Sequence, residues 1–302
     1  MSVAMDPDTF AEIVRLVRDF AGLAFGPDKR YLFESRLRPV LHRHGLASFR
    51  ELRDALARGQ RELRVAVVQA LVTHETSFFR DRPVFDHLER RVLPDLAECR
   101  NGRIRIWSAA TSTGQEAWTL AIVADRLARA RPGARCEIVA SDLSEAALAK
   151  AREGRYSTFE VQRGLTAREL VEYFERDGEA WRVREGLRNR VRFLRHNLLD
   201  APDPLGPPFD LVLLRNVLIY MDAPTRDRVL GHVVRALAPA GCLLVGTSEL
   251  LPPGSPFRRE GEVAGLYRRE TTGRQESAAR SVPRPAVDGL HRPVGGLTAR
   301  LR

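Results

Sequence analysis

The chain has 302 residues, 44% of them hydrophobic, and a formal net charge of +10 at neutral pH. This length can bury one large core and a smaller one, and the charge favours an acidic partner, either nucleic acid or an acidic protein surface. Three widely separated cysteines exclude a disulfide framework and a cysteine metal motif. The sequence starts without signal-peptide features, and no apolar run reaches the roughly 18 residues of a membrane span. We therefore expect a cytoplasmic protein with no membrane insertion.

The first part of the chain has the apolar spacing of amphipathic helices, from residue 8 to about residue 70. Pro39 should kink or end one of these helices. Ser48 followed by Glu51 is the pattern of a capping box that starts another. Residues 30–64 contain nine arginines and four acidic residues. This excess is either a solvated helix face or a surface that docks acidic helices.

A polar stretch with two adjacent aromatics, residues 73–80, precedes a helix predicted over residues 83–98. The central stretch, Ile104–Ile122, then reads as a strand, a turn of small residues and a helix. Such a turn lets a ligand approach the backbone and unpaired helix N–H groups. Gly114 is its only glycine, so the dinucleotide fingerprint G-x-G-x-x-G is absent, which argues against a nicotinamide enzyme.

Asp142 follows a second apolar strand, residues 137–141, and precedes a helix over residues 145–152. An acid at this place can accept hydrogen bonds from both ribose hydroxyls of a nucleoside. The alternative is a helix N-cap, a role that Ser144 would fill better.

The remaining strands are predicted at residues 191–195, 209–214, 242–246 and 265–269, with a helix over 225–237. Residues 155–190 interrupt this alternation with a short helix and a small inserted hairpin. Arg215 and Asn216 stand at a strand's carboxyl end, where ligands bind in open α/β sheets. Residues 271–302 are rich in Arg, Pro, Gly and Ser and lack aromatics, so we expect a disordered tail.

Several stretches resemble one family, the CheR-type chemotaxis receptor methyltransferases, in the family's own order. Its motifs T-N-E-T-x-F-F-R, I-W-S-A-x-x-S-T-G-E-E-P-Y-S-L, A-T-D-I-S, C-R-N-V-L-I-Y and G-x-S-E correspond to residues 73–80, 106–120, 140–144, 214–220 and 246–249. The resemblance covers roughly residues 8–270. Its departures include His74 for the family's Asn, Gln115 for Glu, Ala117 for Pro and Trp118 for Tyr.

The resemblance implies an α/β class I methyltransferase (Rossmann-like) fold with a seven-stranded sheet, a small inserted β-hairpin subdomain and an all-α N-terminal domain. The expected domains are residues 1–72 for receptor docking, 73–270 for methyl transfer, with the insertion at about 155–190, and the tail 271–302. The implied activity transfers a methyl group from S-adenosyl-L-methionine to glutamates of chemotaxis receptor helices, giving methyl esters and S-adenosylhomocysteine. The implied cofactor contacts are His74, Thr76, Arg80, Glu116, Asp142, Asn197, Leu198, Arg215 and Asn216.

Methyl transfer to glutamate requires no general base, because a glutamate carboxylate is already an anion at neutral pH and can attack the methyl group directly. Arg80 either steers the substrate carboxylate or binds the carboxylate of the cofactor. Tyr220 either orients the attacking group or is a core aromatic with its hydroxyl at the rim. No metal is expected.

Two other functions share this fold. A nucleic-acid methyltransferase of the amino-methylating kind carries Asn/Asp-Pro-Pro-Tyr/Phe after the fourth strand, where this chain has Arg215 and Asn216. The second alternative function is that of a non-catalytic signalling adaptor, which keeps the fold and senses the cofactor. We expect receptor helices as the partner, no nucleic acid, and a monomer. The inserted hairpin, residues 173–183, has one glycine, Gly178, and three acids. Few glycines hinder close approach of a peptide backbone, and the acids repel an acidic peptide, so we expect the hairpin to bind no C-terminal tether peptide of a receptor.

Overall fold

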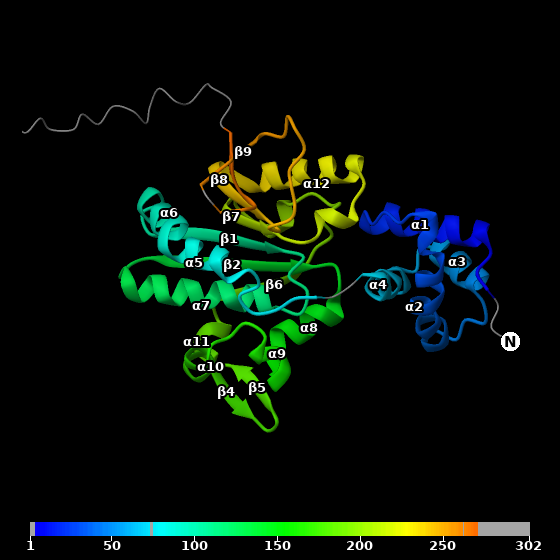
Figure 1. Ribbon diagram of the computed structural model, residues 1–302, viewed down its shortest axis with the longest axis horizontal. Helices are drawn as coiled ribbons and strands as arrows, with labels where there is room; N and C mark the ends of the chain where they lie inside the picture. Colours follow the sequence, from blue (N-terminus) through cyan, green and yellow to red (C-terminus); the bar gives the residue numbers. More distant parts are fainter. Residues whose placement is uncertain (1–3, 73–74, 262, 271–302) are drawn as a thin grey trace, which may run out of the picture. The chain divides into compact units, whose positions relative to one another are not determined.

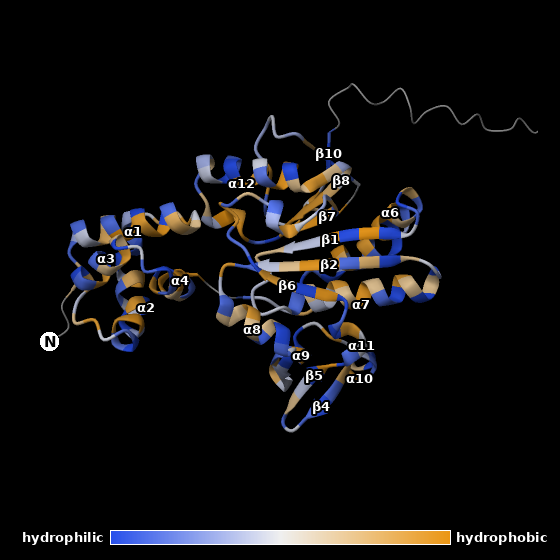
Figure 2. Cartoon of the chain, turned by 180° about the vertical axis from the view of Figure 1, so that it is seen from behind, coloured by the Kyte–Doolittle hydropathy of each residue, from blue (hydrophilic) through white to orange (hydrophobic). Residues whose placement is uncertain are grey.

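The computed structural model describes residues 4–72, 75–261 and 263–270 (Figure 1). The first part of the chain is helical: α1 (Pro7–Ala21), α2 (Arg30–Arg43), α3 (Phe49–Ala57) and α4 (Arg61–Leu71). Their apolar faces share one core, which includes Ile13, Phe33, Leu37, Leu52 and Val67. Figure 2 shows hydrophilic and hydrophobic residues alternating along α1, as expected of a helix with one buried face.

Two local predictions for these helices need adjustment. Pro39 lies inside α2, which continues to Arg43, so Pro39 does not end the helix. Proline removes a single backbone N–H, and buried Leu37 and Val40 on either side keep the helix seated on its core. Ser48 caps α3 as predicted by accepting the Glu51 N–H at 3.2 Å. The carboxylate of Glu51, however, accepts from the Ala47 N–H, one residue before the position that a capping box requires.

The second part is built on a seven-stranded sheet in the order β6-β2-β1-β7-β8-β10-β9. The strands are β1 (Arg103–Ala109), β2 (Arg135–Asp142), β6 (Val191–Arg195), β7 (Phe209–Leu214), β8 (Leu237–Val245), β9 (Phe257–Arg259) and β10 (Leu266–Arg269). The strands from β6 to β8 are parallel, and β10 runs antiparallel to both β8 and β9. The predicted sheet with a late antiparallel strand is confirmed, although β9 was not predicted.

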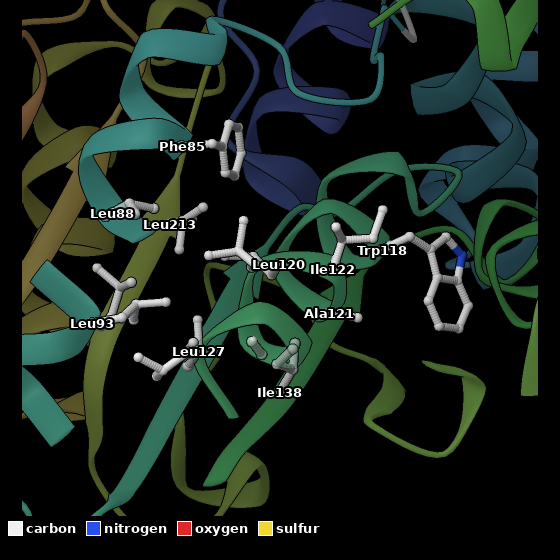
Figure 3. Packing of buried hydrophobic residues seen from close by; sticks show 14 of the residues in the cluster. Phe85, Leu88, Leu93, Trp118, Leu120, Ala121, Ile122, Leu127, Ile138 and Leu213 are labelled. Carbon is white, nitrogen blue, oxygen red and sulfur yellow. The ribbon is translucent and has the colours of Figure 1, made fainter. Parts of the chain in front are cut away.

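Both faces of this sheet are buried, which explains the nearly continuous apolar runs of its strands. On one face, Ile106 and Leu213 contact a cluster formed with α5 (Arg82–His87), a π-helical turn (Leu88–Val92), α6 (Leu93–Cys99) and α7 (Gln115–Ala130) (Figure 3). On the other face, Trp107 and Val212 belong to a cluster with α12 (Ala223–Ala236). The remaining helix beside the sheet, α8 (Glu145–Glu153), ends at Gly154 as predicted.

The interruption after α8 is an inserted subdomain with its own antiparallel sheet, in the order β3-β5-β4. Its elements are β3 (Arg155–Ser157), α9 (Thr158–Gln162), α10 (Ala167–Tyr173), β4 (Phe174–Asp177), β5 (Ala180–Val183) and α11 (Glu185–Arg188). The predicted hairpin is β4 and β5, and β3 adds a third strand. The tail predicted at 271–302 lies outside the described residues. No helix within the described ranges is long and apolar enough to cross a membrane.

Candidate functional site

A pocket opens where the parallel strands end, with about 1140 Å³ of empty space including its mouth. The turn after β1 and the ends of β2, β6 and β7 all contribute to its lining. It brings together every predicted site residue that the structure describes: Thr76, Arg80, Glu116, Asp142, Asn197, Leu198, Arg215, Asn216 and Tyr220. His74 lies outside the described residues.

The turn after β1 is held open toward the pocket by an unusual backbone. Ala110 and Ser112 have positive φ angles of 57° and 54° without being glycine, a conformation that must be stabilised by neighbours. The carboxylate of Asp142 provides such support, because it accepts the Ser112 N–H at 2.8 Å. Gly114, at φ 96°, leaves no room for a side chain, since a Cβ would lie 2.7 Å from the Cβ of Ala151.

Asp142 also accepts the N–H of Ser144 at 2.9 Å. Ser144 itself is the N-cap of α8, because its hydroxyl accepts the Ala147 N–H at 3.0 Å. The capping role considered for Asp142 therefore belongs to Ser144. The carboxylate of Asp142 instead lines the pocket at the end of β2 and orders the turn beside it.

Arg215 is the buried cation of the site, with a side chain only 2% exposed. Its guanidinium donates to the carboxylates of Asp81 at 2.6 Å and Glu116 at 3.2 Å, and to the backbone carbonyl of Arg80 at 2.9 Å. The other carboxylate oxygen of Glu116 accepts the Ser108 hydroxyl at 2.8 Å. Arg215 thus fixes both an acidic wall of the pocket and the loop that carries Arg80.

Glu249 is a buried acid that braces the loop after β7. It is 3% exposed and accepts the backbone N–H groups of Gly246 at 2.6 Å, Asn216 at 2.7 Å and Ile219 at 3.2 Å. Asn216 has a positive φ of 59°, so this part of the loop needs external support. A Cβ on Gly246 would lie 2.6 Å from the Asn216 amide nitrogen, which explains the glycine.

Sequence reasoning assigned no role to Asp81, Ser108 or Glu249. Glu249 stands in the last matched motif, four residues after the end of β8, and an acid so close to the carboxyl end of an apolar strand is the signal that could have found it. No local pattern marks Asp81, because its partner Arg215 lies 134 residues away. Ser108 stands in the matched motif of residues 106–120, and its partners Thr111 and Glu116 lie in the same stretch.

The helical part of the chain supplies one wall of the pocket through Val65, Val68 and Gln69 of α4. Asn197 joins the two parts: its amide donates to the Phe20 carbonyl at 2.7 Å, and its oxygen accepts the Leu199 N–H at 3.1 Å. The side chain of Asn197 therefore orders the pocket wall. No sequence pattern predicts that α4 reaches the site.

Three polar atoms at this pocket are buried without a hydrogen-bond partner among the described residues: Ser112 Oγ, His196 Nε2 and Arg215 Nε. Burial also lowers the pKa of His196 and favours its neutral form. Unpaired buried groups cost free energy unless a ligand or water satisfies them. S-adenosylmethionine fits this lining, since it brings a carboxylate, ribose hydroxyls and adenine nitrogens to a pocket that holds both cations and carboxylates.

The strand order, the antiparallel β10 and the pocket after β1 and β2 define a class I, S-adenosylmethionine-dependent methyltransferase. The sequence identifies a particular family within this class. Residues 74–261 match the family described as CheR methyltransferase, SAM binding domain, and residues 8–72 match its all-alpha domain. The chain belongs to the CheR methyltransferase family.

Curated relatives agree over most of the chain. It is 40% identical to chemotaxis protein methyltransferase 1 of Pseudomonas aeruginosa, across 76% of this chain and 85% of that protein. It is 35% identical to the chemotaxis protein methyltransferase of Vibrio parahaemolyticus, across 83% and 92%. The Escherichia coli protein of the same name is 36% identical, across 82% and 86%. The protein is therefore an enzyme of the chemotaxis methyltransferase family.

Proposed function

We propose that this protein transfers the methyl group of S-adenosylmethionine to glutamate side chains of chemotaxis receptor helices, forming methyl esters and S-adenosylhomocysteine. The observation that carries the proposal is that four of the family's five matched motifs, in residues 73–80, 106–120, 140–144 and 214–220, line one pocket at the carboxyl ends of the parallel strands. The names of the curated relatives support the chemotaxis context.

The cofactor supplies an activated methyl group on a sulfonium, and the residues of the chain hold the reactants in line. We assign Asp142 to the ribose hydroxyls and Arg80 to a carboxylate, either that of the cofactor or that of the substrate. The carboxylate of Glu116, fixed by Arg215 and Ser108, faces the pocket as a counter-charge. Tyr220 lines the same pocket and is assigned to orient the attacking carboxylate. Alignment and exclusion of water then account for the rate, without a general base.

The proposed receptor surface lies on the arginine-rich helices, as part of a docking domain of residues 1–72. Arg38 is 44% exposed on α2, and Arg43 lines a second, shallower hollow with Lys150. Exposed cations of this kind attract acidic helices and act mainly on association. Arg36 has a structural role as well, because its guanidinium donates to the Leu71 carbonyl at 2.6 Å. Arg38 and Arg43 are therefore the better positions for testing docking.

The experiment is methyl transfer from radiolabelled S-adenosylmethionine to purified receptor cytoplasmic domains. We expect protein label that base releases as methanol, and none on receptor domains whose methylated glutamates are replaced by glutamine. Arg80→Ala should reduce the label strongly, whereas Arg91→Ala, at an exposed position of the π-helical turn, should not. Cofactor binding without any protein label would favour the adaptor instead, and label on nucleic acid would favour the nucleic-acid methyltransferase.

A further inference from the structure

The loop that carries Arg80 adopts a backbone that its own sequence does not favour. Phe79 and Asp81, on either side of Arg80, have positive φ angles of 46° and 61° although neither is glycine. Such a backbone conformation is strained and persists only where the surroundings impose it. Something outside the loop must therefore hold Arg80 in place.

One hold is an ion pair with the inserted subdomain. Arg82, two residues after Arg80, donates to both carboxylate oxygens of Glu169 on α10, at 2.9 and 2.7 Å. Glu169 is 3% exposed and also accepts from Arg126 at 2.9 Å and from the Thr166 N–H at 2.7 Å. Burial alone would raise the pKa of Glu169, but the hydrogen bonds from Arg82, Thr166 and Arg126 lower it to about 2. The carboxylate is charged and fully engaged at neutral pH.

A second hold is steric. Gly164 of the subdomain lies so close to the loop that a Cβ on it would be 1.7 Å from the carbonyl oxygen of Phe78. The Phe78 ring is fully buried and meets two aromatic rings of the subdomain edge to face, Tyr156 at 5.1 Å and Phe174 at 5.3 Å. The Tyr156 hydroxyl in turn donates to the Thr113 carbonyl, in the turn after β1, at 2.7 Å.

We propose that the inserted subdomain is a positioning device for Arg80, and that Glu169 and Gly164 are its positioning residues. Neither touches the pocket. Both act on the loop Phe78–Arg82 and through it on the Arg80 side chain that lines the pocket. The inference rests on the proposed function in one respect, that Arg80 contacts the bound cofactor rather than the substrate.

The test is a double-mutant cycle read by calorimetric binding of S-adenosylhomocysteine to the full chain. Glu169→Gln should weaken binding about tenfold, because small displacements of a binding group are costly. Combined with Arg80→Ala, Glu169→Gln should weaken binding no further than Arg80→Ala alone, because the two residues act through one another. Glu172→Gln, three residues further along α10, removes surface ion pairs with Arg129 and Arg168 and should bind like wild type.

Binding of Glu169→Gln at wild-type strength, or additive losses in the double variant, would overturn the proposal. Gly164→Ala is the independent variant: we expect weaker binding with the circular dichroism spectrum retained, and unchanged binding would count against the steric hold. The readout does not depend on methyl transfer. A wild-type protein that binds S-adenosylhomocysteine but methylates no receptor glutamate would refute the proposed function and leave this coupling measurable.

Discussion

Replacing Glu249 by glutamine should lower both the free energy of unfolding and the affinity of the pocket for its ligand. One Glu249 oxygen accepts from both Gly246 and Asn216, and the other accepts from Ile219. Glutamine has one acceptor oxygen, so at best it keeps the first two bonds and turns an N–H group toward the N–H of Ile219. Losing one charge-assisted bond in a buried place costs about 1.5–3 kcal/mol, and neutralising the two remaining bonds raises the expected total to about 2–4 kcal/mol.

Urea unfolding of the Glu249→Gln variant measures this loss of unfolding free energy. Calorimetry with S-adenosylhomocysteine should show weaker binding as well, since Asn216 depends on the same carboxylate for its left-handed backbone. Glu98→Gln, at an exposed position on α6, is the matched control and should change neither quantity. A Glu249→Gln protein within about 0.5 kcal/mol of wild type would refute the reasoning, because surface substitutions already lie in that range.

Four further predictions concern other parts of the molecule. Asp142→Ala should weaken cofactor binding by about 1.5–3 kcal/mol, the scale of hydrogen bonds to a charged group; unchanged affinity in calorimetry would exclude the ribose role. Charge reversal at Arg38 and Arg43 should raise the KM for receptor and leave cofactor affinity unchanged, and wild-type methylation at subsaturating receptor should slow as salt rises; a salt-independent rate with an unaltered KM would place docking elsewhere. Labelled C-terminal peptides of receptors should show no saturable rise in fluorescence anisotropy when the protein is added, because the hairpin of residues 173–183 does not bind them; saturable binding in the low micromolar range would contradict this prediction. The pKa of Glu169 is lowered from 4.5 to about 2, so its carboxylate adds stability above about pH 4.5 that is lost as the pH falls toward 2. Glu169→Gln should therefore lower the free energy of unfolding by up to about 3 kcal/mol at pH 7, and urea titrations that show the same deficit at every pH would contradict this origin.

The sequence predicted the elements whose periodicity is strong. The two-sided burial of β7 is visible in its apolar run, which only Asp210 interrupts, and the turn after β1 is visible in its small residues. The start of β8 was missed, because Pro239, Ala240 and Gly241 resemble a loop. In the structure they lie within the strand, at an irregularity in its pairing with β7 between Phe209 and Leu211. A local pattern cannot distinguish these two outcomes, since the neighbouring strand decides between them.

The candidate site divides in the same way. Residues that lie at strand ends, such as Asp142 and Arg215, could be predicted because strand ends in a parallel sheet meet at one edge. The roles of Asp81 and Glu169 could not be predicted, because their partners, Arg215 and Arg82, lie 134 and 87 residues away in sequence. Resemblance to a family supplied motif positions, but only the fold shows which of these side chains hold backbone and which line the pocket.

The wall that α4 adds to the pocket has a consequence for how such proteins can be recombined. Val68 and Gln69 line the same pocket as Asp142, and Asn197 is hydrogen-bonded to the Phe20 carbonyl. The helical part therefore cannot be exchanged freely between relatives. A chimera that joins the helices of one relative to the sheet of another would assemble a pocket from mismatched halves. Ligand that binds only the assembled pocket also stabilises the assembly by mass action. Cellular cofactor supply would then set how tightly the two parts stay together.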